Sequence, residues 1–178
     1  MQKKITIAGF GGQGVVLAGN IIARACILEG KNVTGMVSYG VEMRGGTANA
    51  SIVISDKEIA SPVVESPDIA IILNQPSLDK FEDTISKDGL VIMNSSLTER
   101  DLNRSDLDYV KIKATDLAND MGDVRAANIA ALGCFIEKTK LLKMESIERA
   151  INDAFKSKKK GLAELNIKAL HKGAEQCS

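Results

Sequence analysis

The sequence has no tryptophan, a single histidine, three prolines and few aromatic side chains. Aromatic residues make up 3% of the 178 residues, so the chain offers few stacking surfaces for nucleobases or flavin-like rings. The histidine, His171, lies near the C-terminus beside lysines, which leaves little basis for a histidine-centred catalytic group. We therefore expect this chain to carry no catalytic acid, base or nucleophile of its own.

Cysteine is also scarce, and the three cysteines lie far apart without any C-x-x-C pair: Cys26, Cys134 and Cys177. This spacing excludes an iron-sulfur cluster or a zinc site built from this chain alone, so no metal ligands are predicted. Cys26 and Cys134 fall in apolar helical patterns. We expect both to be inert packing residues.

A net charge is absent as well, because 23 basic and 23 acidic side chains cancel. No overall field would attract the chain to nucleic acid or to an anionic membrane, and neither is expected as a partner.

The first apolar run is too short for a signal peptide, and no segment approaches the length of a membrane span. We expect a cytoplasmic protein forming one domain over residues 1–178.

The apolar pattern is that of an α/β protein. A strand over residues 3–8, a helix over 13–29 ending at Gly30, and a strand over 31–37 predict a β-α-β unit. Further strands are predicted at "TANASIVI", "DIAIIL", "GLVIMN" and "YVKIKA", with helical patterns from Thr115 onward. The predicted fold is a doubly wound, mostly parallel, Rossmann-like sheet with C-terminal helices.

Glycines punctuate the first strand-helix junction, "IAGFGGQGVVLAGN". Gly9, Gly11 and Gly14 form G-x-G-x-x-G, the pattern of a dinucleotide-binding turn in which an anion sits at a helix N-terminus. Gly12 and Gln13 make this turn more open than the minimal pattern.

Three interpretations of the turn remain open. An NAD site requires an acidic residue at the end of the second strand, but Val37-Ser38-Tyr39 stands there. The glycines could simply close a strand-helix junction, or the turn could hold another anion, such as a phosphate of coenzyme A or of a cofactor held by a partner.

A second loop, "SYGVEMRGG", presents Glu42 and Arg44 on a glycine-rich backbone. Such a backbone can be approached closely, and the arginine fork can bind a carboxylate or phosphate bidentately. For an arbitrary loop, the usual interpretation would be a local surface ion pair of little energetic value.

Four motifs in fixed order resemble one family: "GFGGQGVVLAG", "SYGVEMRGGTANASIVIS", "NQPSLDKF" and "NIAALG". Together they are similar to the gamma subunit of the 2-oxoacid:ferredoxin oxidoreductases, which covers the pyruvate, 2-oxoisovalerate, 2-oxoglutarate and indolepyruvate enzymes. One position departs from that family, which usually shows proline where this chain has Val41. Proline would stiffen the loop, so valine leaves its backbone freer.

The resemblance implies a subunit of an enzyme that oxidatively decarboxylates a 2-oxoacid to acyl-CoA and CO2 and reduces ferredoxin. It implies partners of the alpha, beta and delta type, which would hold thiamine diphosphate, magnesium and iron-sulfur clusters and bring in coenzyme A, and an isolated chain without activity. The alternatives are a free-standing nucleotide-binding or NAD(P)-dependent Rossmann protein, and a pure assembly module whose turn touches no ligand.

The resemblance also implies two groups of site residues on one edge of the sheet. An anion or coenzyme A edge would be formed by Gly9, Gly11, Gly12, Gln13 and Gly14. A neighbouring edge facing partner subunits and the active site would be formed by Ser38, Tyr39, Glu42, Arg44, Gly45, Gly46, Asn74 and Gln75.

Overall fold

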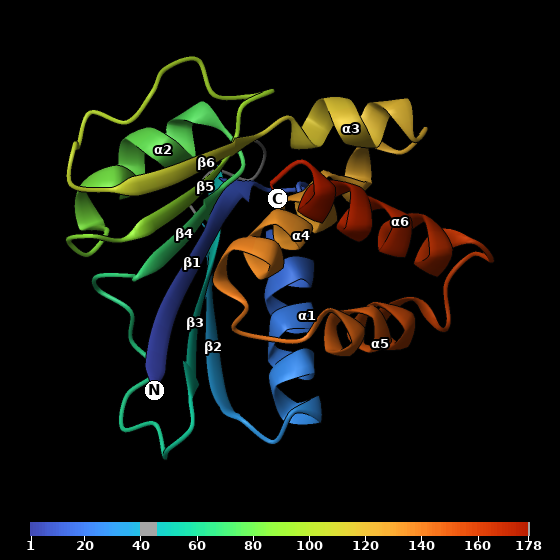
Figure 1. Ribbon diagram of the computed structural model, residues 1–178, viewed down its shortest axis with the longest axis horizontal. Coiled ribbons are helices and arrows are strands. Elements are labelled where there is room, and N and C mark those ends of the chain that lie inside the picture. Colours follow the sequence, from blue (N-terminus) through green and yellow to red (C-terminus); the bar gives the residue numbers. More distant parts are fainter. Residues whose placement is uncertain (40–45, 178) are drawn as a thin grey trace.

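The computed structural model describes residues 1–39 and 46–177, which form a six-stranded sheet with helices on both faces (Figure 1). The sheet order is β2-β3-β1-β4-β5-β6. The strands are β1 (Gln2–Phe10), β2 (Asn32–Tyr39), β3 (Thr47–Ser55), β4 (Ile69–Ile72), β5 (Leu90–Asn94) and β6 (Asp108–Ile112). The helices are α1 (Val15–Leu28), α2 (Gln75–Phe81), α3 (Ala114–Asp120), α4 (Ala127–Thr139), α5 (Met144–Phe155) and α6 (Leu162–Glu175).

The predicted α/β class with a mostly parallel sheet is confirmed. Strands β1, β4, β5 and β6 pair in parallel, as the short apolar runs of β4 and β5 indicate, since these runs are buried almost throughout. Only β3 runs antiparallel, to β1 on one side and to β2 on the other.

The predicted β-α-β unit needs a correction. Strand β3 inserts between β1 and β2, in continuous register with β1 from Gln2 opposite Ser55 to Phe10 opposite Thr47. Strand β2 still runs in the direction of β1, but it lies two strand spacings away, about 10 Å, at the edge of the sheet. The order of strands depends on pairings between distant segments, which the local apolar pattern does not encode.

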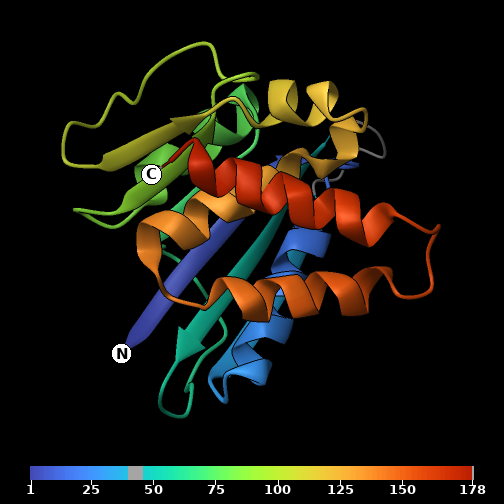
Figure 2. The same cartoon turned by 45° about the vertical axis from the view of Figure 1, so that its right-hand side comes forward.

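Two hydrophobic cores cover the two faces of the sheet. The larger core joins alternate β-strand side chains, such as Ile7 and Ile52, to helices α1, α4 and α5 and to Leu170 of α6. The smaller core joins the opposite side chains, such as Ala8 and Ile72, to Leu78 of α2. Helix α5 packs on α1 and α6 packs on α4, which gives the larger core a second helical layer (Figure 2).

Helices α4 and α6 cross with their backbones in close contact. A Cβ added at Gly133 would lie 1.9 Å from the Leu170 carbonyl oxygen, and one at Gly173 would lie 1.9 Å from the Ala130 carbonyl oxygen. Helix α4 is therefore buried on nearly all sides, between the sheet and α6. None of the helices in the described residues is long and apolar enough to cross a membrane.

A disulfide between Cys134 and Cys177 joins α4 to the segment just after α6. The expectation that Cys134 is an inert packing residue is therefore wrong, because the α4–α6 crossing brings the two sulfurs together across 43 residues. In the chain-entropy account, a cross-link over that separation stabilises the folded state by about 4 kcal/mol. Cys26 alone is a free thiol, and it is buried.

The three cysteines should differ sharply in alkylation. Burial raises the pKa of the Cys26 thiol to about 12, so at about pH 8 the native chain should not react with iodoacetamide. Intact-mass measurement should show one alkylated residue after denaturation and three after denaturation with reduction. Two or more alkylated residues without reductant would contradict the disulfide.

Candidate functional site

The glycine turn lies where β1 ends and α1 begins, at the edge of the sheet formed by the carboxyl ends of the parallel strands (Figure 1). The Gln13 amide donates to the Phe10 carbonyl oxygen at 3.1 Å and closes the turn. Gly12 has a φ of 99° and Gly14 a φ of 70°, so both positions need the conformational freedom of glycine. In open α/β folds, ligands bind at this edge.

Two glycines of the turn are explained by contacts within the chain. A Cβ at Gly9 would lie 2.8 Å from Oε1 of Gln13, and a Cβ at Gly14 would lie 2.3 Å from Nδ2 of Asn128. These two positions let the turn pack against its own protein. The positive φ of Gly14 requires glycine whether or not a ligand binds, and a Cβ at Gly9 would displace the Gln13 side chain that holds the turn.

Gly11 and Gly12 differ, because a Cβ at either would meet no atom of the described residues within 4 Å. Both residues are exposed. Gly12 still needs its positive φ, but Gly11 has neither a positive φ nor a close neighbour. No packing contact among residues 1–39 and 46–177 accounts for glycine at position 11.

Gln13 and Asn74, predicted to share this edge, are brought together. Oε1 of Gln13 accepts hydrogen bonds from the Phe10 amide and from Nδ2 of Asn74, each at 2.7 Å. Oδ1 of Asn74 in turn accepts from the Ser77 amide at 2.9 Å and caps α2. Both side chains hold the turn and the neighbouring helix in place.

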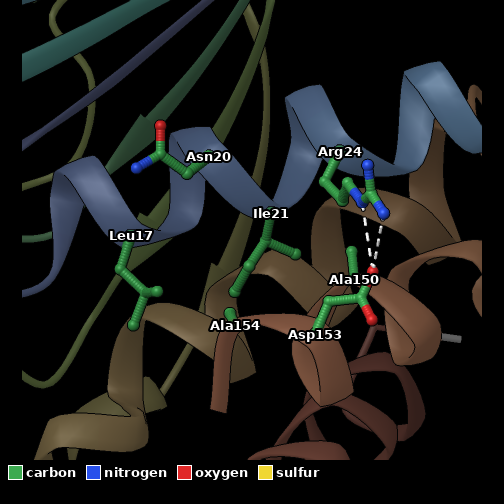
Figure 3. Close-up of a pocket in the computed structure, with 7 residues that line it drawn as sticks. All are labelled: Leu17, Asn20, Ile21, Arg24, Ala150, Asp153 and Ala154. Atoms are coloured by element: carbon green, nitrogen blue, oxygen red, sulfur yellow. Dashed lines mark hydrogen bonds and ion pairs between the residues drawn. The ribbon is translucent and has the colours of Figure 1, made fainter. Parts of the chain in front are cut away.

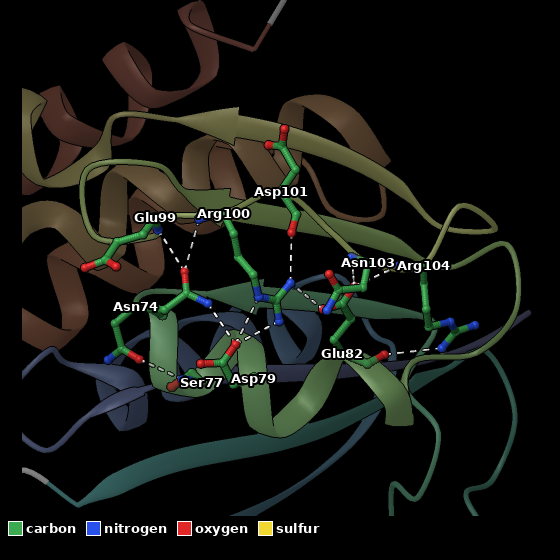
Figure 4. Close-up of polar contacts among 10 residues, drawn as sticks. Asn74, Ser77, Asp79, Glu82, Glu99, Arg100, Asp101, Asn103 and Arg104 are labelled. Atoms are coloured by element: carbon green, nitrogen blue, oxygen red, sulfur yellow. Dashed lines mark hydrogen bonds and ion pairs between the residues drawn. The ribbon is translucent and has the colours of Figure 1, made fainter.

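Gln75 belongs to a different network, in which Figure 4 shows Arg100 reaching Asp79. Its Oε1 accepts from the Glu99 amide at 2.8 Å, and its Nε2 donates to Asp79 at 2.8 Å. Arg100 donates to Asp79 and to the buried Glu82, at 2.8 and 2.7 Å. This network fixes the segment after β5 against α2 and does not join the glycine turn.

Two further asparagines lie at this edge, and neither was predicted there from the sequence. Asn94, at the end of β5, donates to the Leu73 carbonyl oxygen at 3.1 Å and to Thr115 at 2.9 Å. Asn128, near the start of α4, donates to the Gly14 carbonyl oxygen at 2.8 Å, and its Oδ1 accepts from the Ile129 amide. Their positions after an apolar strand and at the head of "NIAALG" were the available signals.

Two adjoining hollows lie beside the turn, and both include Gly12 and Arg125 in their walls. The smaller, of about 120 Å³, lies among the edge amides and is also lined by Gln13, Asn94 and Asn128. The larger, of about 350 Å³, opens toward α5 and α6 and is lined by Gly12, Gly14, Leu17, Asp123, Arg125, Ala126, Phe155, Lys158, Leu162 and Asn166. We call the larger one the edge hollow.

The electrostatics of the edge hollow favour an anion. The N-termini of α1, α4 and α6 all reach it, and their N-cap residues Gly14, Ala126 and Gly161 cap no backbone N–H with a side chain. Helix N-termini carry partial positive charge. The amides of Ala127 and Ile129 in α4 and of Leu162 in α6 are already paired within the chain, so these helices contribute their dipoles rather than free donors at these positions. Arg125 and Lys158 add two exposed cations, although Asp123 pairs with Arg125 at 2.7 Å and offsets part of this charge.

A separate groove of about 530 Å³ runs between α1 and α5 (Figure 3). Its floor includes Ile21 and Ala150, and an ion pair of 3.0 Å between Arg24 and Asp153 spans it. Leu17 lines both this groove and the edge hollow.

The residues predicted on the second loop are only partly described. Glu42, Arg44 and Gly45 lie outside the described residues. Gly46 lies against the turn, since its carbonyl oxygen accepts from the Gly11 amide at 3.3 Å. Ser38 and Tyr39 end β2, and β3 separates them from β1. The position expected to carry an NAD ribose carboxylate therefore does not adjoin the glycine turn.

Within residues 1–39 and 46–177, no group of three or more His, Cys, Asp or Glu side chains could hold a metal ion.

The fold and this edge define an α/β domain of the Rossmann-like class that presents a glycine turn and a basic hollow on one side. The chain belongs to the pyruvate ferredoxin/flavodoxin oxidoreductase family, which it matches over residues 4–176. The resemblance inferred from the four motifs is thereby confirmed.

Individual relatives agree with this assignment. The chain is 39% identical to the 2-oxoglutarate synthase subunit KorC of Methanocaldococcus jannaschii, covering 98% of this chain and 94% of that protein. It is 36% identical to the ketoisovalerate oxidoreductase subunit VorA of Methanothermobacter thermautotrophicus, covering 98% of this chain but 36% of that protein. The gamma subunit of a keto/oxoacid ferredoxin oxidoreductase from Geobacter sulfurreducens has the same fold, with a TM-score of 0.83, 30% identity and 98% of each chain covered.

These relatives are subunits of oxidoreductases. The expectation of an oxidoreductase subunit of the 2-oxoacid:ferredoxin class is therefore confirmed. The alternative, a free-standing NAD(P)-dependent protein, receives no support from them.

Proposed function

We propose that this chain is the gamma-type subunit of a complex that oxidatively decarboxylates a 2-oxoacid, reduces ferredoxin and releases the acyl group as acyl-CoA. The observation that carries the proposal is the end-to-end likeness to KorC, which extends over 98% of this chain and 94% of that subunit. In the proposed complex, alpha-, beta- and delta-type subunits hold thiamine diphosphate, magnesium and iron-sulfur clusters, and ferredoxin docks through the complex.

Within that complex, the contribution of this chain is the glycine turn and the edge hollow. Coenzyme A carries anionic phosphates, and the hollow combines three helix N-termini with Arg125 and Lys158. Gly11 and Gly12 leave the backbone open to such a group, while Gly9, Gln13 and Gly14 fix the shape of the turn. A phosphate group of acyl-CoA therefore fits this edge in both charge and space.

The neighbouring residues belong to the proposed contact with the other subunits. Asn74 holds the turn in place through its hydrogen bond to Gln13. Ser38, Tyr39, Glu42, Arg44, Gly45, Gly46 and Gln75 complete the set proposed for this interface and active-site edge. Arg44 is the residue proposed to bind a carboxylate of a partner or an anionic ligand, because its guanidinium can donate two parallel hydrogen bonds.

The direct test is to purify the native complex through a tag on this chain. We expect a thiamine-diphosphate subunit to co-purify, and the complex to reduce ferredoxin only when a 2-oxoacid and coenzyme A are both present. Recovery of the chain alone from its source cells would overturn the proposal. Isolated chain that bound NAD(H) saturably in calorimetry would favour the Rossmann alternative instead.

A further inference from the structure

The two edge strands of the sheet are protected very differently. Strand β6 is five residues long and carries Asp108 and Lys111, the latter paired with Asp101. Strand β2 is eight residues long, "NVTGMVSY", and contains neither a charged residue nor proline. Short length, charge and proline are the usual devices that stop an edge strand from pairing with another chain. Strand β2 has none of them.

The outer edge of β2 is open in the part of the chain that the structure describes. Strand β2 pairs with β3 along its whole length, from Asn32 opposite Ser55 to Tyr39 opposite Ala48. No other hydrogen bond of the described residues joins β2 to another element. Helix α1 packs on one face through Val33 rather than along the edge. Half of the backbone N–H and C=O groups of β2 are thus left for an additional strand.

Apolar side chains stand exposed on both faces of this edge. Met36 is 49% and Val37 is 45% exposed, and adjacent residues of a strand point to opposite faces of the sheet. A strand with solvent on one face would be expected to alternate polar and apolar residues. Strand β2 alternates in this way except at Met36, an exposed apolar side chain on the face that otherwise carries Asn32, Thr34 and Ser38.

We propose that β2 is a docking edge, at which an extended, uncharged segment of a partner subunit adds a seventh strand to the sheet. The proposal rests on the proposed function of the chain as an oxidoreductase subunit. The likeness to VorA favours a different subunit as the occupant, because the matching region makes up only 36% of that protein. In VorA the rest of the polypeptide is covalently joined to this unit, whereas a separate subunit must be held by contacts such as β-strand addition.

An uncharged segment is favoured because the exposed middle of β2, Gly35 to Val37, offers no charge to pair with. A charged side chain buried there would lose its hydration without gaining a partner. The backbone hydrogen bonds would supply affinity, and Met36 and Val37 would supply apolar contact on the two faces.

Hydrogen exchange of the native complex and of the isolated full chain tests the proposal. Amides within residues 33–38 should exchange about tenfold or more slowly in the complex, because their outward N–H groups become paired. Amides within residues 109–111 of β6, the other edge strand, are the control, and their exchange rates should be the same in the complex and in the isolated chain. Equal exchange of β2 in both states, in a complex that is intact and active, would overturn the docking edge and leave the proposed function standing.

Charged substitutions give a second readout. Val37→Lys should lower recovery of the partner subunit by about tenfold, because a lysine would be desolvated without a counter-charge. Tyr109→Lys is the control on β6, since Tyr109 has the same exposure of 45%, and it should leave recovery unchanged. Both isolated variants should melt within a few degrees of the wild type, as surface changes do.

Equal recovery with both variants would also count against the docking edge. A dimer of the isolated chain, with a Met36→Cys variant cross-linking to its own copy, would identify a second copy as the occupant and overturn the proposal of a different subunit. Failure to recover any partner with the wild-type chain would instead overturn the proposed function.

Discussion

Gly133→Ala should lower the free energy of unfolding by about 3 kcal/mol or more. The added methyl group would lie 1.9 Å from the Leu170 carbonyl oxygen and 2.8 Å from the Leu170 carbonyl carbon. Both are backbone atoms of α6, so relief requires moving the whole helix rather than turning one side chain. The disulfide from Cys134 to Cys177 limits that movement, because it ties the end of α6 to the residue that follows Gly133.

Gly19→Ala is the matched control, since Gly19 also lies inside a helix, α1. The nearest atom to its added methyl group would be Cβ of Ala50 at 3.1 Å, a contact with a side chain rather than with backbone. Alanine favours a helix over glycine by up to about 1 kcal/mol, which offsets a small clash. Urea denaturation of the three proteins measures the difference. A Gly133→Ala protein as stable as Gly19→Ala would show that α4 and α6 do not pack at backbone distance.

Local features were predictable from the sequence because their causes are local. The turn needs glycine at Gly12 and Gly14 for a positive φ, and a run such as Ile69–Ile72 indicates a buried strand by composition alone. The family resemblance likewise rests on short motifs. Each of these signals lies within a few residues, so a single sequence contains it.

Features that join distant segments were not predictable in this way. The insertion of β3 between β1 and β2 is decided by the pairing of Phe10 with Thr47 and the rest of that register. The disulfide joins residues 43 apart, and the hydrogen bond from Asn128 to the Gly14 carbonyl oxygen joins residues 114 apart. The sequence can mark such an asparagine by its position, but it does not reveal which backbone oxygen the side chain binds, because every residue offers one.

The same distinction separates the glycines of the turn. Gly14 needs its positive φ, and at Gly9 and Gly14 the side chains of Gln13 and Asn128 lie so close that an added Cβ would displace them. Gly11 has no such neighbour in the described residues. The motif thus divides into positions that serve the fold and one position, Gly11, that no contact of the described residues explains.

Gly11→Leu should raise the KM for coenzyme A of the assembled complex by about tenfold or more, with little change in kcat. The side chain would meet no atom of the described residues, so it would enter the space proposed for the ligand. The isolated variant should therefore melt like the wild type. Gly11→Ala is the smaller matched change and should have a smaller effect on KM, because it fills less of the same space.

Arg125→Gln tests the charge of the same edge. Loss of one exposed cation from the edge hollow should raise the KM for coenzyme A by several-fold at low salt, and the difference from wild type should shrink as ionic strength rises. A steric effect at Gly11 would not depend on salt in this way. If both Gly11→Leu and Arg125→Gln leave the KM for coenzyme A unchanged, the turn serves the fold alone. If the complex dissociates in Gly11→Leu, Gly11 contacts a subunit instead of a ligand.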